Sequence, residues 1–167
     1  MSLVSLLLSA WLGAGALFAA VVAPAAFALL PSRTLAGTLV GRVLPVLFIA
    51  GLVIALIGLW LDRPDRGRAP RVRRVALLAL AVSCAVAQLV VAPRIARVRG
   101  EIGGPIEQLS TDDPRRVAFG RLHAVSVGWL GIAMLAAGVT IVLASLTPRP
   151  QRARDPEPIT AGVSRRS

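Results

Sequence analysis

Four long blocks of apolar residues divide this chain, and they constrain its fold more than any other feature. They occupy about residues 3–30, 36–61, 75–93 and 122–146. A block of about 18 or more apolar residues can cross a bilayer as a helix, in which every backbone polar group is bonded internally. Hydrophobic residues make up 56% of the chain, so these blocks dominate it. The sequence therefore predicts an all-α, polytopic membrane protein with a four-helix antiparallel transmembrane bundle.

The predicted transmembrane domain covers residues 1–147, and charged connections join its spans. The segment 62–74 contains six arginines, and residues 94–121 form the longest predicted loop. Residues 148–167 are rich in Pro and Arg, which predicts a disordered tail. The first block has no basic start and exceeds the roughly 7–15 apolar residues of a signal-peptide core. We therefore expect it to be retained as a helix.

The charge of the chain is strongly positive, at a formal +11, and every basic residue is arginine. The arginines lie almost entirely between and after the apolar blocks, where such charges set orientation and meet anionic lipid headgroups. No aromatic residues alternate with them, so we expect no nucleic acid partner. Four spans place both termini on one side, which has eleven arginines against eight on the other. The positive-inside rule then predicts an inner (plasma) membrane protein with cytoplasmic N- and C-termini.

Two short motifs occur twice in the same order. VVAP stands at 21–24 and 90–93, and a Gly-Arg-aliphatic triplet opens the second block at 41–43 and the fourth at 120–122. This order predicts two tandem helical hairpins in the same orientation. It also brings five unusual residues to one membrane face, namely Pro24, Pro93, Arg42, Arg121 and His123.

Three segments carry a family resemblance: WLGAGALFAAVVAPAAFALLPSRTLAGTLVGRVLPVLF, APRIARVRG and FGRLHAVSV. Together they resemble the bacterial four-helix membrane family called domain of unknown function 4149, which is similar to eukaryotic transmembrane protein 205. The resemblance covers most of residues 5–145. The fourth block departs from the family pattern at VGWLG, where we expect a stretch richer in Leu and Asn. The resemblance implies a four-helix fold and a membrane location, but it implies no activity.

The polar residues and prolines at the shared face are the candidate ligand-binding residues. His123 could bond a loop carbonyl at a helix start, or it could contact a ligand or relay a proton. Arg42 could snorkel to the interface, or it could face inward as an anion or headgroup contact, with Arg121 at the repeat-equivalent place. Prolines free backbone carbonyls that could serve as ligands, although they more often only kink a helix. The predicted set is Arg42, Arg121, His123, Pro24, Pro93 and Gln88.

Small residues in the first two blocks predict close helix packing. Gly37 and Gly41 form a GxxxG motif, and Ser9 with Gly13 forms a similar pair of small residues. Such faces let helix backbones approach closely. They suit a homo-oligomer or a partner membrane protein.

Several motifs of catalysis are absent from the sequence. It contains no P-loop, no HExxH motif and no acidic residue within the four apolar cores. One cysteine cannot build a Cys-based metal site, and a haem at His123 would need a second axial ligand nearby. We therefore expect no catalytic residue, no metal and no cofactor, and an enzyme is the weaker class of function.

Two hypotheses for the function remain. In the first, the protein binds or moves a small molecule or lipid at the non-cytoplasmic mouth of the bundle. In the second, it is a structural or accessory membrane protein that packs through its small-residue helix faces and meets anionic lipid through its arginines.

Overall fold

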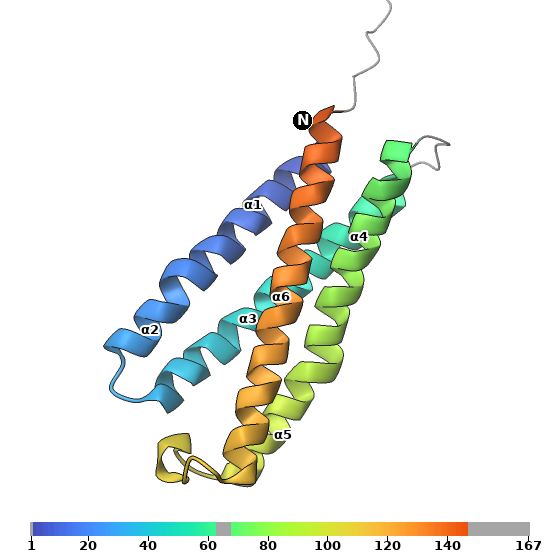
Figure 1. The fold of residues 1–167 in the computed structure, drawn as a ribbon. Helices are drawn as coiled ribbons and strands as arrows, with labels where there is room; N and C mark the ends of the chain where they lie inside the picture. The colour runs from blue at the N-terminus through green and yellow to red at the C-terminus, as the bar shows by residue number, and fades with distance from the viewer. Residues whose placement is uncertain (1, 63–67, 147–167) are drawn as a thin grey trace, which may run out of the picture.

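The computed structural model describes residues 2–62 and 68–146, and nearly all of them are helical. The elements in chain order are α1 (Leu3–Leu17), η1 (Phe18–Val22), α2 (Ala23–Leu29), α3 (Arg33–Leu61), α4 (Arg68–Val86), η2 (Ala87–Val91), α5 (Ala92–Ile102), η3 (Ile106–Gln108) and α6 (Pro114–Leu146) (Figure 1). η1 and η2 are π-helical turns, and η3 is one 3-10 turn. The predicted tail at 148–167 and part of the 62–74 connection lie outside the described residues.

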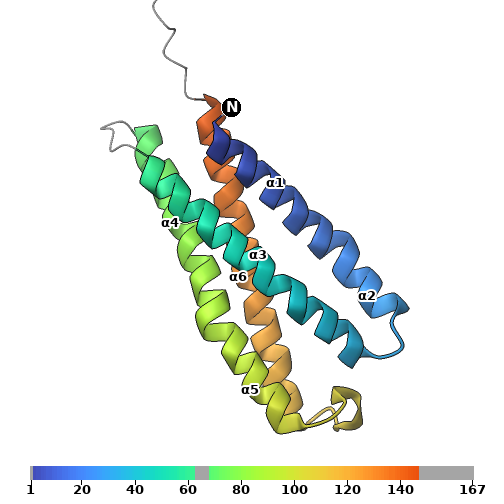
Figure 2. The ribbon, with the colours of Figure 1, turned by 180° about the vertical axis from the view of Figure 1, so that it is seen from behind.

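Four helical rods are long and apolar enough to cross a membrane: Leu3–Leu29, Arg33–Leu61, Ala69–Ile102 and Pro114–Leu146. They alternate in direction, so the start of α1 and the end of α6 lie at one end of the bundle (Figures 1 and 2). The α2–α3 turn and the segment 103–113 lie at the other, which we call the loop end. The predicted antiparallel four-helix bundle is confirmed, and the chain is a multi-pass membrane protein.

The core of the bundle combines a few large side chains with many small ones. Its buried members include Leu8, Trp11, Phe48, Ala55, Leu77, Leu80, Cys84, Leu130, Ala133 and Ala137. Many large aliphatic side chains instead face outward, as Leu135 does at 72% exposure. In a bilayer such side chains contact lipid, and helices associate through close packing rather than through exclusion of water. This distribution is what a bundle surrounded by lipid requires.

Each of the two π turns ends inside a copy of the VVAP motif. At each copy the alanine N–H bonds to the carbonyl five residues earlier, from Ala23 to Phe18 and from Ala92 to Ala87. The proline that follows has no N–H and crowds the preceding turn, and a π turn absorbs that disturbance within a continuous helix. The repeated motif thus has a repeated backbone conformation, which agrees with the predicted tandem hairpins.

The third rod continues past Pro93, where the sequence predicted its end. α5 extends to Ile102 and ends on Gly103, whose φ of 66° is the left-handed conformation that favours glycine at a helix end. The connection to the fourth rod is therefore 103–113 rather than 94–121. The physical reason is that proline is tolerated in the first turn of a helix, and after the π turn Pro93 occupies that position.

Candidate functional site

A cavity of about 690 Å³ lies at the loop end of the bundle. The first half of α3, the η2–α5 segment and the beginning of α6 form most of its wall, and α2 and η3 contribute at its edges. The lining is mostly apolar, and its ionisable or polar members are Arg33, Gln88, Arg99, Glu107, Arg116, His123 and Ser126. Sites that bury a drug-sized ligand have volumes of roughly 300–1,000 Å³. The cavity is therefore large enough to bind a small molecule.

Arg99 projects from α5 toward two glycines of α3. Its Nη2 atom lies 3.1 Å from the position that a Cβ on Gly37 would take, and its Nη1 atom lies 3.7 Å from the corresponding position at Gly41. Its guanidinium carbon lies 5.5 Å from the ring centroid of Phe119, within the range of a cation–π contact. Its Nε atom is buried without a hydrogen-bond partner among the described residues. The glycines thus leave room for a guanidinium group inside the bundle.

Phe119 and His123 lie one turn apart on α6. Their rings are nearly parallel, at an interplanar angle of 4°, with centroids 6.5 Å apart. His123 is half-buried and lines the cavity. Phe119 therefore contacts both the guanidinium of Arg99 and the only histidine of the chain. A neutral imidazole has one donor and one acceptor nitrogen, so an imidazole such as that of His123 can bond to a hydrogen-bond donor or to an acceptor of a ligand.

Gln88 is the second residue of the π turn η2, and it also lines the cavity. Its Oε1 atom is buried, and no described residue bonds to it. A buried polar group without a partner costs about 1–3 kcal/mol, so such atoms are uncommon. π turns occur frequently at functional sites, where they redirect a side chain. Gln88 is therefore a polar group that a bound ligand could satisfy.

The segment 103–113 is tied to the start of α3 at the mouth of the cavity. The carboxylate of Glu107 accepts a hydrogen bond from the Thr34 backbone N–H at 2.8 Å and another from the Thr34 hydroxyl at 2.7 Å. These bonds, the one from the hydroxyl above all, hold the pKa of Glu107 below its ordinary value. A carboxylate at a helix N-terminus also complements the helix dipole. Glu107 thus joins the second helical hairpin to the first.

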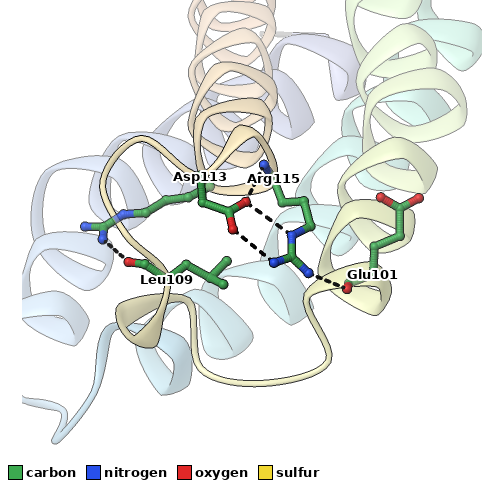
Figure 3. Close-up of polar contacts among 5 residues, drawn as sticks. Glu101, Leu109, Asp113 and Arg115 are labelled. Atoms are coloured by element: carbon green, nitrogen blue, oxygen red, sulfur yellow. Dashed lines mark hydrogen bonds and ion pairs between the residues drawn. The ribbon is translucent and has the colours of Figure 1, made fainter.

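Two arginines at the start of α6 hold the same segment (Figure 3). Arg115 forms an ion pair with Asp113 at 2.9 Å and donates to the carbonyl of Glu101 at 3.3 Å. Its side-chain hydrogen bond lowers the pKa of Asp113. Arg116 donates to the carbonyl of Leu109 at 2.8 Å and also lines the cavity. Arg116 therefore both holds the loop in position and forms part of the cavity wall.

The charges around the cavity are unbalanced. Its lining contains the arginines at 33, 99 and 116 but only one carboxylate, that of Glu107. Glu107 is bonded by Thr34, and Arg116 is bonded by a backbone carbonyl. Neither ion pair found in the described residues includes Arg99. The cavity therefore carries an excess of positive charge, and Arg99 is a half-buried arginine without an acidic partner among the described residues.

The structure places two of the predicted ligand-binding residues, His123 and Gln88, in the cavity wall. The other four are exposed and do not belong to its lining, namely Arg42, Arg121, Pro24 and Pro93. A direct ligand contact by those four stays a prediction. An exposed arginine on these helices can extend along the apolar surface to reach lipid headgroups, which is the alternative for Arg42.

The residues predicted to serve helix packing also differ in their surroundings. Gly37 and Gly41 face the guanidinium of Arg99 and line the cavity. Ser9 is half-buried, and Gly13 is exposed, with no described atom within 4 Å of the position of an added Cβ. The face around Gly13 is therefore open to a partner helix or to lipid.

Sequence reasoning missed Arg99 and Phe119, which lie at the centre of the site. A usable signal was present after Pro93, because Ile95, Val98 and Ile102 recur at helical spacing and mark an amphipathic helix. The expectation that the helix ends at the proline concealed that pattern.

The side chains of the cavity can bind a ligand through several kinds of contact. In residues 2–62 and 68–146, no group of three or more His, Cys, Asp or Glu side chains is placed to hold a metal ion. The cavity provides a cation, an imidazole, an amide and a large apolar surface. Such a combination fixes the orientation of a ligand through a few polar groups in an apolar pocket.

A family model described as a domain of unknown function (DUF4149) matches residues 6–103, which is more than half of the chain. The matched part includes both π turns, α3 and Arg99, and it ends before Phe119 and His123. No curated protein and no solved structure matches the sequence. The similarity to eukaryotic transmembrane protein 205 stays a prediction.

Proposed function

Since this chain belongs to the DUF4149 family, whose description states no activity, we propose a function from its site: the protein binds a small molecule or lipid in the cavity at the loop end of its bundle. The observation that supports this proposal best is a pair of unsatisfied polar atoms. Gln88 Oε1 and Arg99 Nε are buried without partners among the described residues, and both side chains line this cavity. Buried polar groups in proteins are normally bonded, so a ligand that bonds there would remove their cost.

We place the cavity on the non-cytoplasmic side of the inner membrane, with both termini in the cytoplasm. The support is the arginine distribution, with eleven on the side of the termini and eight on the side of the loop end. A cavity at the loop end would then open near the outer headgroup region. It could receive a lipid from the bilayer or a small molecule from outside.

The proposal can be tested by photolabelling the purified full-length protein in a neutral detergent. Two twelve-carbon diazirine probes would be used, a fatty acid and the matching alcohol, and adducts would be located by mass spectrometry. We expect at least one probe to label residues 87–100 and 116–126. Adducts confined to outward-facing side chains such as Leu135 would contradict the proposal.

A matched pair of variants shows whether the labelling depends on the cavity. Ala96→Phe adds a ring at a lining residue, whereas Ala28→Phe adds the same ring at an exposed residue outside the lining. Filling the cavity should reduce the labelling severalfold, and the control should leave it unchanged. Equal labelling in both variants would show that the probes bind elsewhere.

A second candidate function is that of an interaction protein, and one observation favours it. An apolar groove between α1 and α6 is lined by Leu12, Gly131, Met134, Leu135, Gly138 and Val139. An added Cβ at Gly131 or Gly138 would have no described atom within 4 Å, so a partner helix could approach closely there. Disulfide cross-linking of Leu135→Cys in a Cys84→Ser background would test for a homo-oligomer. A cross-linked dimer in membranes would support this candidate, and monomer alone would count against it.

A further inference from the structure

We propose that the ligand of this cavity is a single-chain amphiphile with an oxyanion headgroup, a carboxylate or a phosphate, bound by the guanidinium of Arg99. This inference rests on the proposed function and specifies the chemistry of the ligand. The headgroup would lie at Arg99 near the loop end. The apolar chain would lie along the wall that α3, α5 and η2 form deeper in the bundle.

The first argument is the charge of Arg99. Its Nε atom is buried and unbonded, and neither ion pair in the described residues involves it. A cation that is partly removed from water is costly unless an anion compensates it. The only carboxylate in the cavity wall, that of Glu107, is bonded by the backbone and hydroxyl of Thr34. An anion from outside the protein would supply the missing partner.

The second argument is that the guanidinium group is positioned before any ligand arrives. The guanidinium carbon lies 5.5 Å from the ring centroid of Phe119, and Nη2 and Nη1 lie near Gly37 and Gly41 of α3. A planar guanidinium presents its N–H groups in a fixed fork that matches two oxygens of a carboxylate or phosphate. Because the Arg99 side chain is already held in place, it loses less conformational entropy when a ligand binds.

The third argument is the rest of the wall, which suits a chain and not a free ion. Leu44, Phe48, Ala87 and Ile95 also line the cavity, and they lie deeper in the bundle than Arg99. A hydrocarbon chain can pack closely against such a surface, and water alone would fill this surface poorly. The volume of about 690 Å³ is that of a site for a drug-sized ligand, which corresponds to a headgroup with one chain.

The experiment is a competition against the diazirine fatty acid on the purified full-length protein. Three competitors are used. Dodecyl phosphate is an amphiphilic anion, dodecanol has the same chain without the charge, and inorganic phosphate is the anion without a chain. We expect dodecyl phosphate to displace the probe, and we expect dodecanol and inorganic phosphate to need at least about tenfold higher concentrations, the loss associated with one charge-assisted interaction. Competition by dodecanol at the same concentration would overturn the choice of an anion. Equal competition by inorganic phosphate would overturn the choice of an amphiphile.

Variants connect the selectivity to Arg99. Arg99→Gln should weaken the binding of the fatty acid by at least about tenfold and leave that of the alcohol unchanged. Arg97→Gln is the matched control, because Arg97 is on the same helix and exposed but does not line the cavity. If Arg99→Gln does not fold, Gly37→Ala is a second way to disturb the guanidinium. The added Cβ would lie 3.1 Å from Nη2 of Arg99, so that Nη2 would have to shift. Unchanged fatty-acid binding in Arg99→Gln would overturn the inference, and cavity labelling by the alcohol would still support the proposed function.

Discussion

At the scale of single residues, Gly51 lies where α1, α3 and α4 meet. A Cβ at this position would stand 2.8 Å from Cζ2 of Trp11 and 2.9 Å from Sγ of Cys84. Trp11 cannot easily move, because its indole N–H donates to the carbonyl of Leu47 at 2.8 Å. Close contact between α1 and α3 therefore depends on the absence of a side chain at residue 51.

We predict that Gly51→Ala destabilises the protein by about 1–3 kcal/mol, the usual cost of overpacking a core. Thermal unfolding followed by circular dichroism in detergent would measure the loss. Gly13→Ala is the control, because an added Cβ there has no described atom within 4 Å and alanine is the better helix former. A melting temperature for Gly51→Ala equal to that of the control would contradict the packing that the structure shows at this point.

Glu107 gives the stability of the protein a dependence on pH. The Thr34 hydroxyl and backbone N–H lower the pKa of Glu107 in the folded state. The unfolded chain therefore binds the proton more tightly, so the stabilisation is present above the unfolded pKa and is lost as the pH falls through the folded pKa. We predict that Glu107→Gln lowers the melting temperature at neutral pH and that this difference from wild type disappears in acid. Gln108→Ala, which removes an exposed uncharged side chain of the same segment, should change the melting temperature equally at neutral and acid pH.

At the scale of elements, α5 is the part of the chain whose structure was least expected. The helix carries Arg94, Arg97 and Arg99, and it brings the last of these to the cavity. Its course depends on the π turn η2, which lets the helix pass Pro93 without ending. The binding of an anion at Arg99 therefore requires that α5 remains helical.

We predict a helical pattern of labelling along α5 for single cysteines in a Cys84→Ser background. A polar, membrane-impermeant thiol reagent should react strongly at the exposed positions 94, 97 and 101 and weakly at the half-buried positions 95, 98 and 102. Cysteines at Gly104 and Gln108, exposed in the 103–113 segment, provide the reference for full reaction. Uniform reaction from 94 to 102 would show that the loop predicted from the sequence is correct and that α5 is not.

At the scale of the whole molecule, the bundle has two chemically different ends. The loop end contains the cavity and the contacts of Glu107, Arg115 and Arg116. At the opposite end, Arg73 bonds to the carboxylate of Asp62 between α3 and α4. Glu107 bonds the segment after α5 to the start of α3, and Arg73 bonds α4 to the residue after α3, so the contacts at both ends help to fix the relative positions of the helices.

The orientation of the bundle in the membrane can be measured with two cysteines, again in a Cys84→Ser background. We predict that Asp112→Cys reacts with an impermeant reagent in intact cells, as the proposed outward orientation of the loop end requires. Arg71→Cys, an exposed position at the other end, should react only after permeabilisation. The reverse result would place the cavity on the cytoplasmic side and would leave the fold unaffected.

Much of the architecture could be predicted because it depends on runs of neighbouring residues. The four apolar blocks became four spanning helices in the expected order, and the two VVAP motifs became two equivalent π turns. The boundaries near Pro93 were not predicted, because the effect of a proline depends on whether the backbone before it can take up an extra residue in the turn. Sequence spacing alone does not show that.

What the sequence determined by itself is that the chain crosses a membrane four times. Each span must be long enough for the hydrocarbon and must bond its own backbone, and these conditions act on contiguous residues. Only the tertiary structure decided that Arg99, rather than Arg42, enters the cavity. The direction of a side chain around a helix axis depends on what the neighbouring helices leave open, and here two glycines of α3 and the ring of Phe119, distant in sequence, leave room for a guanidinium.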